Sequence, residues 1–301
     1  MKRKVVKLGP TTLVVSLPSK WVSGLKISPG DEITVEESGS ALLLSKEGSI
    51  TPKETTISLT RLTESAIRTA ITNAYRKGFD KVFVKYQNEK QFSILAKVIK
   101  TRLIGYDITK KEQGSCIIEN LTEPSLDQFD KIVQKYLHTI SVLLEESTEA
   151  LKYGKTVGYE DAIEAIQQYD NFCKRVIAKR KVTMPESEFY WTFLTLTTHG
   201  AREIYHLHKG MQKQKGKVAK ETIKVMESCS ALFALLKKCY LKREIALLDD
   251  VHEMEKTVIY KQGYAALQKK DAVVVHHVLA AARNFYLAAS PLLGILLGEQ
   301  D

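Results

Sequence analysis

Cysteine is scarce in this sequence, and its four cysteines form no motif. Cys116, Cys173, Cys229 and Cys239 lie far apart, with no CxxC pair among them. This spacing excludes a zinc ribbon and a dithiol redox motif, and it suits a reducing cytoplasm. We therefore expect four free thiols that are buried in the fold.

The sequence also lacks a long apolar run. Basic residues at positions 2–4 are followed directly by alternating residues, which argues against a signal peptide. The most apolar stretch, 284–298, contains Asn284, Ser290 and Pro291 and is shorter than the roughly 20 residues that a bilayer span requires. We expect a cytoplasmic protein without membrane insertion, in which this stretch is a buried helix.

Familiar catalytic motifs are missing as well. The chain has no GxSxG nucleophile motif, no HExxH metal motif and no glycine-rich loop that leads into a helix. Without a nucleophile beside a base, the sequence predicts no enzyme, and it indicates no cofactor. A regulatory or binding protein is the class that remains.

Positive charge is what the sequence does have, and it is concentrated at the N-terminus. Residues 1–123 carry +7 of the net charge of +10, and residues 1–26 contain basic side chains but no acidic one. A cationic patch on a small domain is typical of a polyanion binder, because each neutralised phosphate releases condensed counterions. The alternative is a basic arm that serves only solubility. The basic residues of 1–26 are Lys2, Arg3, Lys4, Lys7, Lys20 and Lys26.

Short alternating strands are predicted for residues 1–48. They lie near 5–9, 13–15, 33–35 and 42–44, and proline- and glycine-containing turns separate them. A β-unit of this size is too small for a comfortable monomeric core, so we expect it to dimerise with a second copy of itself. Residues 49–54 read as a linker.

Residues 55–123 alternate strand and helix signals and predict a small α/β unit. Strands are expected at 56–59, 82–84 and 116–118, and amphipathic helices at 64–77 and 92–103. No phosphate-binding loop occurs in this unit. We interpret it as a spacer or packing platform without chemistry of its own.

Residues 124–301 are predicted to be helical throughout. Helices with apolar faces run from 126 towards Gly154, through 162–177, and from Pro185 to 207; after a break at 209–220, three more follow at 218–241, 246–268 and 271–297. The two sets, 124–210 and 217–301, have similar lengths, which suggests an internal duplication of a three-helix unit. The whole chain is thus an α+β multidomain protein.

The N-terminal segment resembles a known family of DNA-binding domains. The run VVKLGPTTLVVSLPSKW at 5–21, followed by LKISPGDEI at 25–33, is similar to the SpoVT/AbrB and MazE group. The resemblance implies that two chains exchange hairpins to form one barrel-like homodimer. We interpret Trp21 as a core residue. The resemblance also implies that the first strand and its loops face double-stranded DNA. The candidate DNA-binding residues are Lys2, Arg3, Lys4, Lys7, Thr11, Thr12, Ser19 and Lys20.

The helical segment resembles the PhoU family of phosphate uptake regulators, and the combination of the two is an archaeal-type arrangement. Many PhoU proteins bind metal through two E/D-x-x-x-D motifs. In this chain the corresponding positions hold Thr195 and His199 in the third helix, and Tyr286 and Ser290 in the sixth. Neither pair supplies two carboxylates, which hard cations and iron clusters need. We therefore expect no metal.

A substitute metal site is conceivable on the third helix of this segment. His199, Glu203 and His206 fall at i, i+4 and i+7 of one helical face, although packed or solvated histidines explain the same pattern.

Two further charged runs have structural explanations. Asp249 and Asp250 read as the acidic start of a helix, where negative charge suits the helix dipole. The run Lys174, Arg175 and 179–181 reads as a solvated helix end, although it could bind an acidic partner.

Three functions remain open. The favoured one is a transcription regulator of phosphate uptake, in which the PhoU-like region acts as sensor or signal transducer. The second is a signalling adaptor that docks on a phosphate transporter or kinase, with the β-domain as a dimeriser only. The third is a small-ligand or metal-binding protein built on His199, Glu203 and His206.

Overall fold

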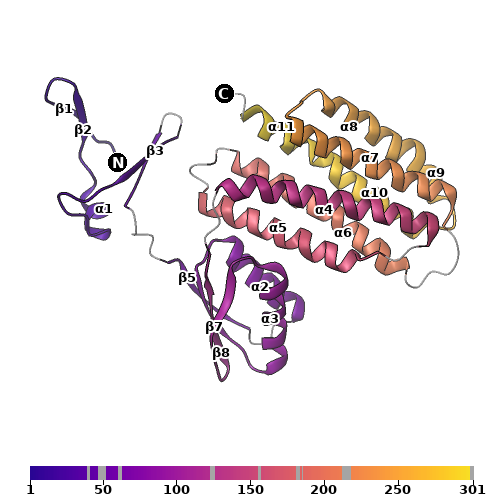
Figure 1. Cartoon of the computed structure of the whole chain (residues 1–301), viewed down its shortest axis with the longest axis horizontal. Coiled ribbons are helices and arrows are strands. Elements are labelled where there is room, and N and C mark those ends of the chain that lie inside the picture. Colours follow the sequence, from indigo (N-terminus) through magenta and orange to yellow (C-terminus); the bar gives the residue numbers. More distant parts are fainter. Residues whose placement is uncertain are drawn as a thin grey trace. The chain divides into compact units, whose positions relative to one another are not determined.

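The computed structural model shows an α+β protein that divides into two compact units (Figure 1). Unit 1 is Met1–Pro52 and unit 2 is Lys53–Asp301. Unit 1 holds small β-sheets, and unit 2 holds an α/β part followed by a mostly helical region. The structure describes residues 1–38, 41–46, 52–59, 63–122, 126–154, 157–180, 184, 186–211 and 218–298.

Unit 1 consists of two antiparallel hairpins and one short helix. Val5 lies opposite Val15 in the first hairpin, and Thr34 lies opposite Ser45 in the second. The four predicted strands are present, whereas the helix after Pro18 was not predicted, because six residues are too few to show a helical period. The elements are β1 (Val5–Leu8), β2 (Thr12–Val15), α1 (Ser19–Gly24), β3 (Thr34–Ser38) and β4 (Ala41–Ser45).

An ion pair holds the loop before β3 to the end of β4. Asp31 Oδ2 accepts hydrogen bonds from the backbone N–H of Ser28 at 2.9 Å and from Lys46 Nζ at 2.6 Å. The hydrogen bond from Lys46 is the main reason that the pKa of Asp31 is lowered. Gly30 has a φ of 95°, which a residue with a Cβ rarely adopts. The SPGD sequence at 28–31 thus forms a tight, specific turn.

Unit 2 begins with a four-stranded sheet and two helices, which we call the middle α/β part. The sheet order is β5-β6-β8-β7; β5 and β6 are parallel, and the other pairs are antiparallel. Its core contains Ile67, Ile71, Leu95 and Ile118. The elements are β5 (Glu54–Ser58), α2 (Glu64–Arg76), β6 (Lys81–Lys85), α3 (Glu89–Arg102), β7 (Tyr106–Glu112) and β8 (Ser115–Asn120).

Two sequence predictions for this part need correction. Strand β7 was missed, because most of its side chains are exposed and charged and give no apolar alternation. The expected linker at 49–54 extends too far, since Glu54 is the first residue of β5; residues 47–51 lie outside the described part of the chain.

The helical region contains the six predicted helical segments around one continuous core. The fifth segment passes through a π-helix, and the sixth is divided at Ala288. Side by side in the core, the rings of Phe233 and Phe285 are 4.7 Å apart. The elements are α4 (Leu126–Tyr153), α5 (Tyr159–Arg180), α6 (Ser187–Met211), α7 (Lys220–Lys242), α8 (Leu247–Lys256), η2 (Thr257–Gly263), α9 (Tyr264–Leu267), α10 (Ala272–Leu287) and α11 (Ala289–Gly298).

The third and sixth segments make the most extensive helix contact, between α6 and α10. A Cβ atom added at Gly200 of α6 would lie 2.3 Å from Cε1 of Phe285, so only glycine permits this close approach. Residues 272–298 are also long and apolar enough to cross a membrane by length and composition alone, and half of that window is buried. A core helix of a bundle has the same properties, and α10 packs against both α6 and α7.

The middle α/β part is fixed to α5 by buried charges. Arg175 is fully buried; it donates to the carbonyl oxygens of Tyr75 and Phe79 at 3.1 and 2.7 Å and pairs with Asp80 at 2.8 Å. Lys179 pairs with the same Asp80 oxygen at 2.5 Å. The interpretation of this run as a solvated helix end is therefore wrong, because its first members form the seam with the middle part.

The four cysteines are free and buried, as predicted from their spacing. Burial raises the pKa of Cys116 and Cys239 to about 11 and that of Cys229 to about 12, and it also raises the pKa of Cys173 well above its ordinary value. Since thiolates are the reactive form, these side chains are chemically inert at neutral pH.

Candidate functional site

The first candidate surface is the basic N-terminal hairpin of unit 1. Lys2, Arg3 and Lys4 precede β1, Lys7 lies on β1 opposite Leu13, and all four basic side chains are exposed. Thr11 and Thr12 form the end of the turn and the start of β2, and both are exposed. The structure thus brings most of the predicted DNA-binding residues to one hairpin.

Ser19 and Lys20 lie elsewhere in unit 1. They are the first two residues of α1, and both are exposed. Figure 1 shows α1 well apart from the turn of the β1–β2 hairpin, so one chain does not place these two residues beside Thr11 and Thr12. Trp21, expected in a core, is only partly buried in the single chain.

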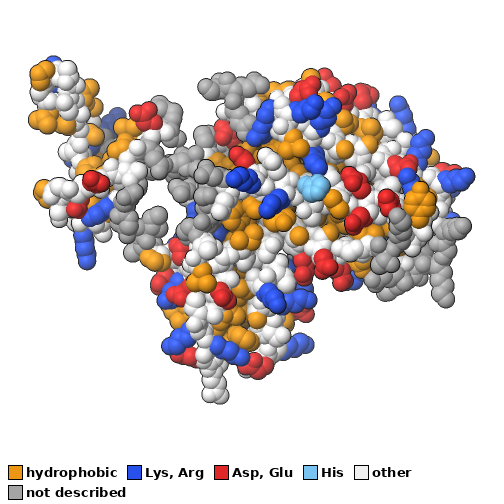
Figure 2. All heavy atoms as spheres, viewed as in Figure 1, with side chains coloured by type: hydrophobic (Ala, Val, Ile, Leu, Met, Phe, Trp, Pro, Cys, Tyr) orange, Lys and Arg blue, Asp and Glu red, His pale blue; other side chains and the backbone are white. Residues whose placement is uncertain are grey.

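Both faces of the β1–β2 hairpin are uncovered. In an antiparallel pair, opposite residues share a face, so Val5, Val15 and Leu13 lie on one face while Val6 and Val14 lie on the other. These side chains are from 37% to 70% exposed. Figure 2 shows this as hydrophobic side chains at the surface of the hairpin. A two-stranded ribbon with two apolar faces requires cover from elsewhere to be stable.

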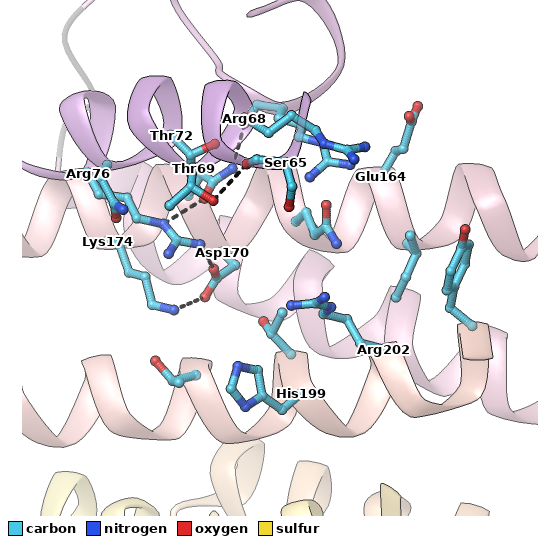
Figure 3. A pocket seen from close by; sticks show the side chains of 18 of the residues that line it. Ser65, Arg68, Thr69, Thr72, Arg76, Glu164, Asp170, Lys174, His199 and Arg202 are labelled. Atoms are coloured by element: carbon cyan, nitrogen blue, oxygen red, sulfur yellow. Dashed lines mark hydrogen bonds and ion pairs between the residues drawn. The ribbon is translucent and has the colours of Figure 1, made fainter. Parts of the chain in front are cut away.

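The second candidate site is a cleft in unit 2, with a volume of about 640 Å³, between the middle α/β part and the helical region. Helices α2 and α3 form one wall, and α5 and α6 form the other (Figure 3). Six lining residues are lysine or arginine and three are acidic. The basic ones are Arg68, Arg76, Lys97, Arg102, Lys174 and Arg202, and the acidic ones are Glu160, Glu164 and Asp170.

Two of the basic residues share one carboxylate. Asp170, which is fully buried, pairs with Arg76 at 2.8 Å and with Lys174 at 2.7 Å. Arg76 also donates to Asn171 Oδ1 at 2.8 Å. Burial is the main cause that lowers the pKa of Lys174, and the charge of Asp170 opposes it. This end of the cleft is a closed network that holds α2 against α5.

Of the four remaining basic residues, three have no ion-pair partner in the part of the chain that the structure describes. Within the described part of the chain, no carboxylate lies within 4.0 Å of the charged nitrogens of Lys97, Arg102 or Arg202, and neither guanidinium donates a hydrogen bond. Arg68 has only a long contact of 3.4 Å to the exposed Glu64. Figure 3 shows Arg202 extending from α6 into the space below α2.

These basic groups repel one another. Burial and then the positive charge of Arg68 lower the pKa of Arg102; the negative charge of Glu164 opposes this, and Arg202 adds to the lowering. Burial likewise lowers the pKa of His199 and of His206, and Arg202 opposes protonation of both. The open end of the cleft therefore holds several basic groups near one another, with only partial compensation from acidic side chains.

The three substitute metal ligands form no metal-binding group. His199 and His206 line the cleft, and the carboxylate of Glu203 lies 2.8 Å from His277 Nδ1 on α10, against which the His206 ring also stacks. In the described ranges, no group of three or more His, Cys, Asp or Glu side chains is arranged to hold a metal ion. The i, i+4, i+7 pattern does not bring the three together.

The two residue pairs that depart from the PhoU motif lie in different surroundings. Thr195 lines the cleft together with His199. Tyr286 packs edge-on against His252 of α8, and Ser290 is exposed.

Sequence reasoning missed the cleft, and the reason is geometric. Arg102 and Arg202 are 100 positions apart in sequence and meet only because α3 packs on α5. The one available signal was the apolar spacing of the helix at 64–77, which leaves Arg68 and Arg76 together on its polar side.

Comparison with protein-family models, with curated proteins and with solved structures finds no match for this chain.

Proposed function

We propose that the chain is a cytoplasmic, DNA-binding transcriptional regulator of phosphate uptake or homeostasis that acts as a homodimer. Unit 1 binds double-stranded DNA, and the helical region of unit 2 acts as sensor or signal transducer. The observation that carries the proposal is an exposed β-hairpin on which basic side chains gather and acidic ones are lacking. The resemblances to SpoVT/AbrB-like and PhoU-like domains supply the regulatory context.

Charge is the first support for DNA binding. The residues before and on β1 provide four exposed basic side chains, and the adjoining turn adds two hydroxyl groups. Lysine, arginine and short hydroxyl side chains are the usual donors to phosphate oxygens. A dimer would present this set twice, which suits a duplex with two half-sites.

Exposed apolar surface is the support for a dimer. Each hairpin face carries valine or leucine side chains that a single chain leaves in contact with solvent. A second copy of unit 1 would cover them, as in the swapped-hairpin barrel that the sequence resembles. The helical region would then correspond to a PhoU-like pair of three-helix bundles that share one core.

A titration of the full chain against labelled promoter and random duplexes at several salt concentrations tests the proposal. We expect binding at low salt and a linear fall of log affinity with log salt concentration. The variant Lys2→Gln/Arg3→Gln/Lys4→Gln should lower that slope by about one for each phosphate that it no longer neutralises. The matched control is Lys238→Gln/Lys242→Gln/Lys269→Gln, which removes the same charge from exposed positions of unit 2.

The alternative is a signalling adaptor that docks on a phosphate transporter or kinase. The exposed apolar faces of unit 1 are equally suited to a dimeriser without DNA contacts. Absence of affinity for any duplex at low salt, or equal binding by the triple variant and the wild type, would leave the adaptor as the function.

A further inference from the structure

The cleft belongs to unit 2 and has basic side chains of its own. We propose that it binds a small phosphorylated molecule, whose phosphoryl group is held by Arg102, Arg202 and Lys97. This binding does not require DNA. Only the further claim that the ligand is the signal sensed by the regulator rests on the proposed function.

The first argument is an excess of positive charge. The lining has six basic and three acidic side chains, and within the described part of the chain Lys97, Arg102 and Arg202 have no carboxylate within 4.0 Å, although Glu164 acts on Arg102 from farther away. Cations that line a cleft together repel one another unless an anion joins them. A bound anion would relieve that repulsion, and a cation would increase it.

The second argument concerns the kind of anion. Two guanidinium groups from opposite walls, Arg102 of α3 and Arg202 of α6, line the same cleft. A guanidinium presents a planar fork of donors that matches the oxygens of phosphate in two parallel hydrogen bonds. The hydroxyl group of Ser65 adds a donor from α2, whereas that of Thr69 already donates to the carbonyl oxygen of Ser65 at 3.0 Å. A tetrahedral oxyanion can use donors from several directions at once, which makes a phosphoryl group the best match.

The third argument is size. A volume of about 640 Å³ lies in the range of pockets that hold organic ligands, roughly 300–1,000 Å³. Along α6 the lining runs from Trp191 to His206, which at about 1.5 Å per residue is roughly 22 Å. An adjoining hollow of about 130 Å³ between α2 and α3 shares Arg68, Lys97 and Arg102. The cleft can therefore hold a phosphorylated organic molecule as well as a free phosphate ion.

A ligand in the cleft would contact two different parts of unit 2. Arg102 belongs to the middle α/β part and Arg202 to the helical region, so one bound phosphoryl group would join both. The middle part, which the sequence indicated only as a spacer, would then form half of a binding site.

Calorimetric titration of the full chain with ADP, inorganic phosphate and adenosine tests the proposal. We expect ADP or phosphate to bind and adenosine not to bind, and the tighter of the first two identifies the source of the phosphoryl group. Arg202→Gln and Arg102→Gln should each weaken that binding about tenfold, since a hydrogen bond to a charged group contributes on the order of one decade in affinity. Arg202 is exposed, so its variant keeps the fold even if the Arg102 variant does not.

The matched control is Arg3→Gln, which removes an exposed arginine from unit 1. It should weaken DNA binding and leave ligand binding unchanged, whereas Arg202→Gln should do the reverse, so the failure of either proposal is visible separately. The cleft proposal is overturned if neither ADP nor phosphate binds at millimolar concentration. It is also overturned if adenosine binds as well as ADP, or if both arginine variants bind like the wild type.

Discussion

Arg175 of α5 and Asp80 of the middle α/β part form an ion pair, with 2.8 Å between Nη2 and Oδ1. The Arg175 side chain has no exposed surface, and that of Asp80 is 16% exposed. Burial alone would raise the pKa of Asp80, but the hydrogen bonds from Lys179 and from the backbone of Lys53, together with the two nearby cations, lower it. Asp80 therefore remains ionised and holds both cations in place.

Removing this carboxylate should destabilise unit 2. We expect Asp80→Asn to lower the free energy of unfolding by about 3–5 kcal/mol at pH 7, because Arg175 would be left buried without its partner charge. The folded-state pKa of Asp80 lies below its ordinary value of 3.8, so its contribution is complete above that value and is lost as the pH falls through the folded pKa. Urea unfolding at several pH values measures this.

The control for that experiment is Glu146→Gln, which removes an exposed carboxylate from the middle of α4. Its effect should stay within about 0.5 kcal/mol. A difference between wild type and Asp80→Asn that stays the same down to pH 2 would contradict the assignment.

A second prediction concerns the dimer. Val6 and Val14 lie opposite each other on one face of the β1–β2 hairpin. The variant Val6→Asp/Val14→Asp should raise the dimer dissociation constant at least tenfold, because burying two unpaired charges is costly. Sedimentation of the full chain over a range of concentrations measures it. Val273→Asp, at an exposed position of α10, is the control, and a wild type that sediments as a monomer would argue against the swapped hairpin.

A third prediction distinguishes two basic residues of unit 1. Arg3→Ala should cost roughly 1–3 kcal/mol at the preferred site and reduce sequence preference, because an arginine can contact a guanine edge with two hydrogen bonds. Lys7→Ala should weaken all duplexes alike and lower the salt slope by about one per chain. Titrations against preferred and random duplexes separate the two effects. Unchanged binding by both variants would remove the hairpin from the DNA interface.

A fourth prediction concerns a buried histidine of the helical core. Burial lowers the pKa of His208 to about 4 from 6.5. Ser147 Oγ donates to the carbonyl of Leu143 at 2.5 Å and lies 2.7 Å from His208 Nε2, so neutral His208 donates from Nε2. Because the unfolded chain takes up the proton first, stability is unaffected above about pH 6.5. As the pH is lowered from 6.5 to 4, the free energy of unfolding should decrease by about 1.4 kcal/mol per pH unit.

Replacing His208 tests this directly. His208→Gln should make the free energy of unfolding less dependent on pH between 6.5 and 4 than in the wild type. His138→Gln changes an exposed histidine of α4 and should keep the wild-type profile. Parallel profiles for His208→Gln and the wild type would show that His208 is not the titrating group.

Periodicity in the sequence was enough to predict most elements of the fold. The helices of 124–301 have regular apolar faces, and residues such as Tyr136 and Ile140 are buried as their spacing indicates. Strand β7 was not predicted, because the residues of an exposed edge strand need not alternate between apolar and polar. Local pattern was sufficient wherever one face of an element meets the core.

Charge was harder to interpret than apolar spacing. Lys174 and Arg175 look like a solvated pair in sequence, and their burial depends on Asp170 and Asp80, of which Asp80 lies 95 positions from Arg175. The cleft has the same origin, since α2, α3, α5 and α6 each contribute part of it. Such sites form only when the helices pack together, so no local sequence pattern predicts them.

The two apolar cores of unit 2 are separate, and the seam between them is held mainly by buried ion pairs and hydrogen bonds from α5. Ile104 of the middle part also packs against the helical core, but exposing charged and polar groups does not raise the heat capacity of unfolding as exposing apolar surface does, so the charged contacts of the seam add little to it. The charged contacts of the seam, and therefore the pH, should decide whether the two cores unfold together in one cooperative step or separately in two.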